Sequence, residues 1–260
     1  MTTGTRKVGE FSWFNMLTPQ PDKARAFYTE LLGWTFDEMP GNIGYTVRVG
    51  GKEAGGMFDL AAPQTPPGTP AEIGVVVRVD SADAMAKKAQ SLGGTVRQVF
   101  DVFDHGRLAV IDDPNGANID VWEARKHVGA DVDSQAHGAP TWFETMTSDV
   151  AKATKFYTSL FGWTAEVKEP VPGMKYTLFK QAGKPVGGLM GIVPSMGPVK
   201  PHWAVNFAVR DVDAAASTAT RLGAKITVPP TDIPTVGRFC GIMSPQGVAF
   251  YVLKWSMPMG

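Results

Sequence analysis

The chain has 260 residues, of which 43% are apolar and 19% charged, and its 25 Lys+Arg residues balance its 25 Asp+Glu residues. This length suits two globular domains, and the balanced charge lacks the basic signature of a nucleic-acid or anionic-membrane partner. The sequence has no apolar run of about 18 residues that would cross a bilayer, and its first residues lack a secretory apolar segment. We therefore expect a cytoplasmic protein with no nucleic-acid and no membrane partner.

A single cysteine, Cys240, excludes an internal disulfide and a cysteine metal cluster. Its apolar neighbours predict a buried strand position, so we interpret it as a packing thiol.

Two long segments of the chain repeat each other. Residues 13–35 and 142–164 share W-F at their start, F-Y-T in their middle and G-W-T at their end, and the similarity continues to the end of each copy. A period of about 130 residues matches a whole domain rather than a solenoid unit. We predict one domain over residues 8–123, a polar hinge over 124–140 and a second domain over 141–256.

Each copy is predicted to contain two similar halves. The first half opens with a strand and continues with a helix whose apolar residues recur at helical spacing and which ends at Gly33 or Gly162. Short strands with glycine turns follow, at 45–49 and around 55–58 and at their equivalents 176–179 and 187–190. Proline-rich stretches then predict linkers.

The second half repeats this order. Strands are expected at 73–79 and 203–209, each followed by a helix that ends at glycine. Two more strands close each copy, at 108–112 and 118–123 and at 239–243 and 249–254. The pattern predicts an α+β fold in which each copy is β-α-β-β-β twice.

This arrangement resembles the glyoxalase/bleomycin-resistance/extradiol-dioxygenase superfamily, also called vicinal oxygen chelate proteins. Three patterns carry the resemblance over nearly the whole chain: T-x-D with FY-x2-LF-GW from Thr147, V-x-D-V-D-A-A from Val209, and a G-R pair followed by a Pro-x-Gly turn near the end of each copy. The IP-x-VGRF run from Ile233 is similar to a "hydroxylase" or glyoxalase-like subgroup. The resemblance implies two tandem glyoxalase-type domains with curved mixed sheets around a cleft.

The resemblance also implies a divalent metal held by His, Gln or Glu at three strand positions. These positions hold Trp142, Ala204 and Tyr251 in the second copy and Trp13, Gly74 and Asp120 in the first. Because only Asp120 is a metal-ligand type, we expect the usual site to be lost and no cofactor to be required.

Strand alternation places further polar residues on the same face as these positions, and their grouping depends on which halves pair. Pairing within each copy predicts one site with Trp13, Asn15, Glu72 and Asp120, and another with Trp142, Glu144, His202 and Tyr251. Pairing across copies would instead gather the carboxylates Glu72, Asp120 and Glu144, and this trio could bind a hard cation such as Mg²⁺ or Mn²⁺. Fe or Zn would be further candidates for such a metal site.

Glu144 is the strongest catalytic candidate. It lies within a strand, and burial there would raise its pKa as a general base requires; a structural hydrogen bond is the alternative. His202 or Tyr251 would be the proton donor, although His202 also reads as a packed or exposed linker residue.

Other residues are candidates for binding a substrate. Trp13, Trp142, Trp122 and Tyr251 could line a flat apolar slot or simply fill the core, with Asn15 and Asn206 on the same face. Arg107 and Arg238 recur in both copies and could bind a carboxylate or phenolate, or pin a neighbouring loop.

We therefore interpret the chain as a small-molecule enzyme that acts on an aromatic or dicarbonyl metabolite without the usual metal. The alternative is a non-catalytic protein that sequesters a drug or metabolite. The duplication can satisfy a dimer interface internally, so both a monomer and a homodimer are compatible with the sequence.

Overall fold

The computed structural model describes residues 5–63, 65 and 68–256. The first copy contains β1 (Phe11–Thr18), α1 (Pro21–Leu32), β2 (Thr35–Glu38), η1 (Pro40–Asn42), β3 (Tyr45–Val49), β4 (Lys52–Asp59), β5 (Glu72–Val79), α2 (Ala82–Ser91), β6 (Thr95–Val102), β7 (Gly106–Asp112) and β8 (Asn118–Ala124). The second contains β9 (Pro140–Thr147), α3 (Val150–Phe161), β10 (Thr164–Val171), β11 (Met174–Gln181), β12 (Lys184–Gly191), η2 (Pro194–Met196), β13 (His202–Ala208), α4 (Val212–Arg221), β14 (Lys225–Ile233), β15 (Gly237–Met243) and β16 (Ala249–Trp255).

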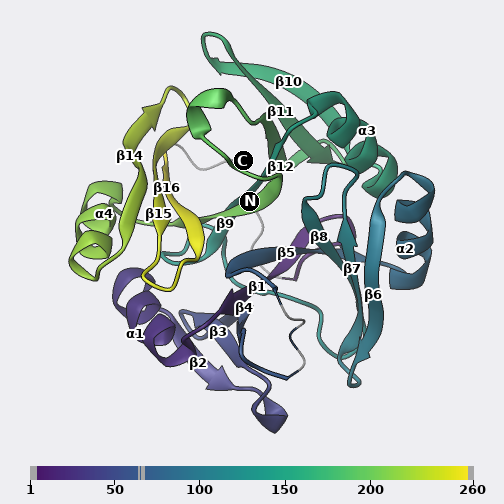
Figure 1. The fold of residues 1–260 in the computed structure, drawn as a ribbon, viewed down its shortest axis with the longest axis horizontal. Coiled ribbons are helices and arrows are strands. Elements are labelled where there is room, and N and C mark those ends of the chain that lie inside the picture. Colours follow the sequence, from purple (N-terminus) through teal and green to yellow (C-terminus); the bar gives the residue numbers. More distant parts are fainter. Residues whose placement is uncertain (1–4, 64, 66–67, 257–260) are drawn as a thin grey trace.

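The strands form two eight-stranded mixed sheets, one from each copy (Figure 1). Their orders are β2-β3-β4-β1-β5-β8-β7-β6 and β10-β11-β12-β9-β13-β16-β15-β14. The two halves of a copy meet where β1 runs antiparallel to β5, or β9 to β13. The halves therefore pair within each copy, and the predicted α+β fold of two tandem domains is confirmed.

The edge strands β2, β6, β10 and β14 were not located by the sequence patterns. They are largely exposed and rich in charged or polar residues, as in TFDE and TVRQVFDV. A strand paired on one side only does not need the alternating apolar residues that identify an inner strand.

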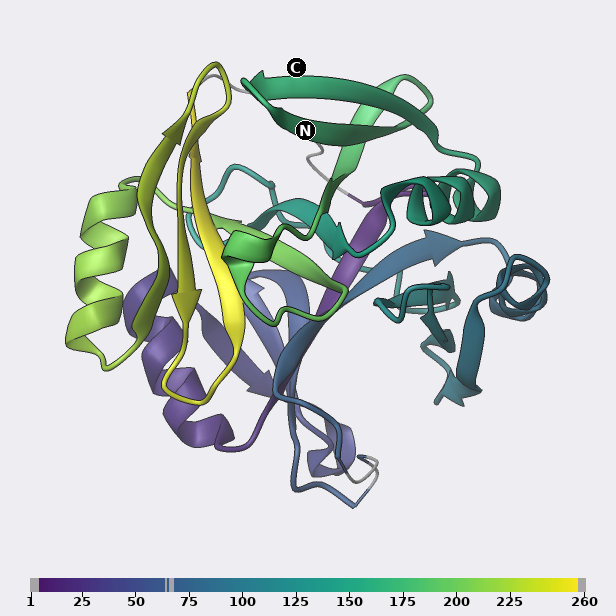
Figure 2. The same cartoon turned by 45° about the horizontal axis from the view of Figure 1, so that its top comes forward.

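The four helices cover one face of the sheets, with α1 beside α4 and α2 beside α3 (Figures 1 and 2). The predicted signals for the first helix of each copy are confirmed: Pro21 stands in the first turn of α1, and the Asp149 side chain accepts a hydrogen bond from the N–H of Lys152. Gly33 and Gly162 end α1 and α3 in the left-handed conformation that glycine adopts without strain.

One hydrophobic core joins the two copies. Phe11 of β1 stacks on Phe143 of β9 with ring centroids 4.3 Å apart, and Phe14 meets Phe207 edge-on at 5.3 Å. The core side of each sheet is the helix side, because Phe14 and Met16 alternate with Trp13 and Asn15 along β1. We call the opposite side of each sheet its inner face.

The segment between the copies is not the loose hinge that its composition predicted. β8 extends to Ala124 and β9 begins at Pro140, so the linker comprises residues 125–139. Ala130 and Val132 are buried, Arg6 donates to the carbonyl of Val132 at 2.8 Å, and Trp34 donates to the carbonyl of Gly138 at 2.8 Å. These contacts attach the linker to the shared core.

Cys240 is fully buried in β15, as predicted, and burial raises the pKa of its thiol to about 11. In the described part of the chain, none of the helices has the length and apolar character required to span a bilayer.

Candidate functional site

The centre of the second inner face is built by β9, β13 and β16, which lie side by side in that sheet. Register places Glu144 opposite Ala204, and places Asn206 between Trp142 and Tyr251. Because alternate residues of a strand face the same side, these side chains share the inner face.

Glu144 is held by two hydrogen-bond donors. The Tyr176 hydroxyl donates to its Oε2 at 3.1 Å, and the Asn206 amide donates to its Oε1 at 3.2 Å. The Trp142 indole N–H in turn donates to the Tyr176 hydroxyl at 2.7 Å. Glu144 keeps an intermediate exposure, so this four-residue network, which we call the Glu144 network, remains reachable from solvent.

Burial sets the proton affinities of this network. Desolvation raises the pKa of the Glu144 carboxyl, whereas the hydrogen bonds from Asn206 and Tyr176 and the nearby His202 oppose that shift. Burial also raises the pKa of the Tyr251 hydroxyl to about 12, with a further contribution from Glu144. Near neutral pH Tyr251 is therefore a proton donor.

Tyr176 is the member of the network that the sequence patterns missed. Its ring lies over Gly188, where an added Cβ would stand only 1.8 Å from the tyrosine hydroxyl. The sequence comparison had paired Tyr176 with Tyr45, but Tyr45 lies on the opposite side of its strand, with the Arg25 guanidinium of α1 over its ring. A shift of one residue in a strand exchanges its faces, which explains the error. The two consecutive glycines at Gly188 were the available signal.

We expect Gly188→Ala to destabilise the protein by about 1–3 kcal/mol, because the new methyl group overlaps the Tyr176 ring and forces it away from Glu144. Urea unfolding would measure the change in the free energy of unfolding. In a Tyr176→Ala background the same substitution should cost much less, since the overlap is gone. Equal costs in both backgrounds would contradict the proposed reason.

His202 lies at the start of β13 with intermediate exposure, and its Nδ1 is 2.8 Å from the carbonyl oxygen of Lys200. That contact identifies Nδ1 as the donor and leaves Nε2 available to another group. The structure places His202 on the same inner face as Glu144, without a hydrogen bond between them.

Both recurring arginines lie on the helix side, away from the inner faces. Arg107 forms an ion pair through two nitrogens with Asp83 of α2, at 2.9 and 3.1 Å. Arg238 binds Asp213 of α4 in the same way, at 2.8 and 2.9 Å. The predicted role in binding a substrate carboxylate is wrong, because these contacts hold the strands to the helices.

The first inner face has different chemistry. Asp120 is 6% exposed, accepts a hydrogen bond from Asn118 at 3.2 Å, and has its pKa raised to about 7 by burial, with Glu72 adding to the shift. Burial likewise raises the pKa of Glu72. Asn15 lies opposite Gly74 on the same face.

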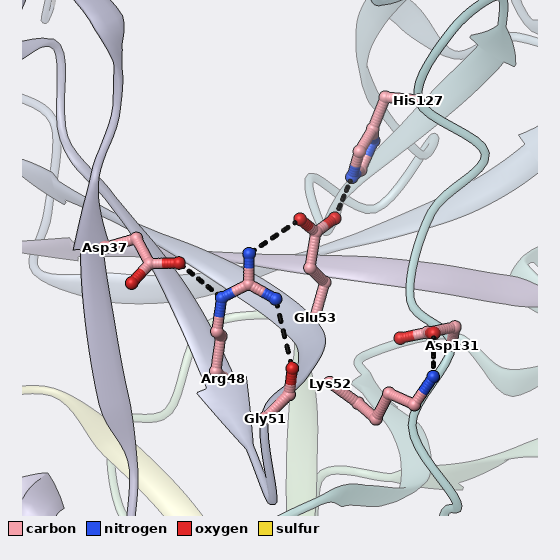
Figure 3. A network of polar contacts seen from close by, with 7 residues as sticks. All are labelled: Asp37, Arg48, Gly51, Lys52, Glu53, His127 and Asp131. Carbon is pink, nitrogen blue, oxygen red and sulfur yellow. Dashed lines mark hydrogen bonds and ion pairs between the residues drawn. The ribbon is translucent and has the colours of Figure 1, made fainter.

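The linker covers the tryptophan end of this face. His127 meets the Trp13 ring edge-on at 4.7 Å, and its carbonyl accepts a hydrogen bond from the Trp122 indole at 2.8 Å. Figure 3 shows the ties to the β3–β4 hairpin, where His127 contacts Glu53 at 3.1 Å and Lys52 contacts Asp131 at 2.9 Å. Arg48 joins Glu53 to Asp37 in the same network. Trp13 and Trp122 thus hold the linker, and they lie on a different sheet from Trp142 and Tyr251.

Pairing within each copy also separates the carboxylate trio. Glu72 and Asp120 belong to the first sheet and Glu144 to the second, so the predicted alternative of a metal site made by all three is wrong. Over residues 5–63, 65 and 68–256, no three His, Cys, Asp or Glu side chains are grouped as metal ligands. The second inner face does not fit a divalent metal, because both Glu144 oxygens accept hydrogen bonds and the adjacent positions are Trp142, Ala204 and Tyr251.

The model of the Glyoxalase/Bleomycin resistance protein/Dioxygenase superfamily matches residues 10–121 and 140–252. The chain therefore belongs to this superfamily. It is 36% identical over 252 residues to "Putative glyoxylase CFP32" of Mycobacterium tuberculosis, covering 95% of both chains. It is 33% identical over 260 residues to the anthracycline biosynthesis protein DnrV of Streptomyces peucetius, covering 95% of this chain and 93% of the relative.

Solved structures with low sequence identity share the fold. The 2,3-dioxygenase LapB from Pseudomonas sp. KL28 superimposes with a TM-score of 0.65 at 14% identity, covering 99% of this chain and 96% of LapB. The Mn(II)-bound glyoxalase from Novosphingobium aromaticivorans gives a TM-score of 0.64 at 16% identity, covering 95% and 82%.

Proposed function

We propose that the second inner face binds a planar aromatic or dicarbonyl metabolite and that Glu144 acts there as a general base, in a glyoxalase/hydroxylase-like reaction that uses no metal. One observation carries the proposal: a solvent-reachable carboxyl with a raised pKa is fixed by two donors among aromatic side chains. Such a shifted carboxyl at a defined position is typical of a catalytic site.

The hydrogen bonds suit a base that must keep its orientation. Tyr176 and Asn206 each occupy one lone pair of the carboxylate, and a carboxylate has about four such sites. Glu144 can therefore accept a proton from a ligand while both donors hold it in place. The raised pKa makes the carboxylate a stronger base than a solvated glutamate.

The proton transfer that this geometry supports is abstraction of an acidic C–H next to a carbonyl. The C–H bond electrons pass into an enolate, the proton moves to a Glu144 oxygen, and the negative charge gathers on the carbonyl oxygen. A hydroxyl such as that of Tyr251, or the ring of His202, would donate a hydrogen bond to that oxygen. Return of the proton to carbon regenerates the carboxylate.

Aromatic rings around Glu144 favour a flat ligand. Trp142 meets Trp255 edge-on at 5.8 Å, and Phe239 lies 6.3 Å from Tyr251. Flat rings offer a large apolar contact area to an aromatic substrate. The relatives agree with this class, because one is named a glyoxylase and another is named for anthracycline biosynthesis.

Glu144→Gln tests the proposal directly. With 1-phenylpropane-1,2-dione, which combines an aromatic ring and a dicarbonyl, we expect the wild-type protein to catalyse deuterium exchange of the methyl protons. The variant should lose about a hundredfold in exchange rate because glutamine cannot accept the proton. Proton NMR in D₂O measures exchange, and quenching of tryptophan fluorescence measures binding.

Glu72→Gln is the matched control, since it removes a carboxylate from the other inner face and should leave the exchange rate unchanged. Equal exchange by wild type and Glu144→Gln would show that Glu144 is not the base. Saturable binding without exchange in the wild-type protein would instead support the alternative of a sequestering protein.

A further inference from the structure

We propose that the first inner face is a second, separate binding site, which takes an organic cation through a primary ammonium group placed against Asp120, Glu72 and the neighbouring asparagines. The proposal does not rest on the function of the second copy. It follows from four hydrogen-bond acceptors that converge on one glycine.

Gly74 is the centre of this site. A Cβ added there would lie 3.6 Å from Asn118 Oδ1 and 4.0 Å from Asp120 Oδ2, so the missing side chain leaves space in front of both oxygens. Asn15 is the register partner of Gly74, and Glu72 precedes it by two residues on the same face. Asn15, Glu72 and Asn118 all keep intermediate exposure, so the space is reachable.

These acceptors lack donors within the described part of the chain. Asp120 is more than nine-tenths buried, and its one hydrogen bond, from Asn118, engages Oδ1 and leaves Oδ2 directed at the Gly74 space. The Glu72 carboxylate takes part in none of the hydrogen bonds or ion pairs found among these residues, although burial raises its pKa. A buried acceptor without a donor is costly, so a ligand that supplies N–H groups would be bound strongly.

The nearby cation is already used. Arg97 donates to Asp112 Oδ2 at 2.6 Å, and the other oxygen of Asp112 is buried without a hydrogen-bond partner. The face therefore carries three carboxyls for one guanidinium. An incoming positive charge would correct this imbalance, and an ammonium group offers three N–H donors to the acceptors around Gly74.

The arrangement favours an organic ammonium over a metal ion. The three carboxyls of this face are not grouped as metal ligands in the described residues, whereas hydrogen bonds tolerate their longer spacing. The second copy lacks the whole set, because its register gives His202 for Glu72, Ala204 for Gly74 and Tyr251 for Asp120. The two faces are thus built for different ligands.

Titration of the full ¹⁵N-labelled chain with benzylamine, at about pH 8 where the amine is protonated, tests the site. We expect saturable shifts of the Gly74 amide and the Asn118 side-chain amide at up to about 10 mM ligand, and none with the neutral isostere benzyl alcohol. Asp120→Asn and Glu72→Gln should each weaken binding about tenfold or more. Glu144→Gln should leave it unchanged, which separates this site from the proposed reaction.

Three results would overturn the proposal. They are the absence of shifts at Gly74 with benzylamine, equal shifts with benzyl alcohol, and stoichiometric binding of Mg²⁺ or Mn²⁺ at Gly74 that benzylamine does not displace. Benzylamine shifts that persist unchanged in folded Asp120→Asn and Glu72→Gln proteins would also contradict it.

Discussion

Asp120→Asn should raise the free energy of unfolding by up to about 4 kcal/mol at about pH 8. Burial raises the pKa of Asp120 from the model value of 3.8 to about 7, a difference of about 3 units, and each unit corresponds to about 1.4 kcal/mol. The folded state binds the proton more tightly than the unfolded state, so the stability present below about pH 4 is lost as the pH rises toward 7. Asparagine mimics the protonated carboxyl and still accepts the hydrogen bond from Asn118.

Urea unfolding of both proteins at several pH values measures this effect. The advantage of the variant should be greatest near pH 8 and should nearly vanish at about pH 4, where the wild-type carboxyl is protonated in both states. A pH-independent difference, or a less stable variant at pH 8, would show that the carboxylate is not strained by burial. A carboxyl that costs stability in the free protein is expected at a position kept for binding.

Asp113→Ala should destabilise the protein by about 3–5 kcal/mol. Asp113 is 3% exposed, and its Oδ1 accepts the backbone N–H groups of Asn115 and Ala117. Its Oδ2 accepts the Tyr157 hydroxyl of α3 at 2.8 Å, and that hydroxyl accepts the Trp203 indole N–H at 2.8 Å. Alanine would leave three buried donors without an acceptor, and one of the lost contacts joins the two copies.

Ser244→Ala is the matched control, because Ser244 occupies the equivalent turn of the second copy and accepts the N–H of Val248 at 3.1 Å. It should cost only about 1 kcal/mol, since a single hydrogen bond to a neutral hydroxyl is lost. Chemical unfolding compares the variants. Similar losses for both would mean that the contact between Asp113 and Tyr157 contributes little.

The fold was largely predictable from the sequence. The repeat, the helical spacing around Tyr28 and Tyr157, and the glycine helix ends are local patterns, and all agree with the structure. The linker was misjudged because Ala130 and Val132 bury small side chains against Ser12 and its neighbours, which composition cannot show. Packing between segments far apart in sequence decides whether a polar segment is mobile or attached.

The candidate site was predictable only in part. Alternation along β9 and β13 placed Glu144 and Asn206 on one face, as expected from the period of two in a strand. Tyr176 was missed because its contact with Glu144 depends on the open space at Gly188 and on the register of β11 against β12. The two arginines were assigned to the wrong face because their partners, Asp83 and Asp213, lie on helices that are distant in sequence from them.

The sequence by itself determined the duplication, the α+β architecture, the burial of Cys240 and the candidate status of Glu144, because each depends on residue type and local spacing. Only the tertiary structure decided which halves pair. Closing each copy on itself places Asp120 with Glu72 and keeps Glu144 apart with Tyr176, giving two inner faces of different chemistry. That choice depends on strand pairing and on the core shared by both copies, and these long-range contacts leave no periodic signal in the chain.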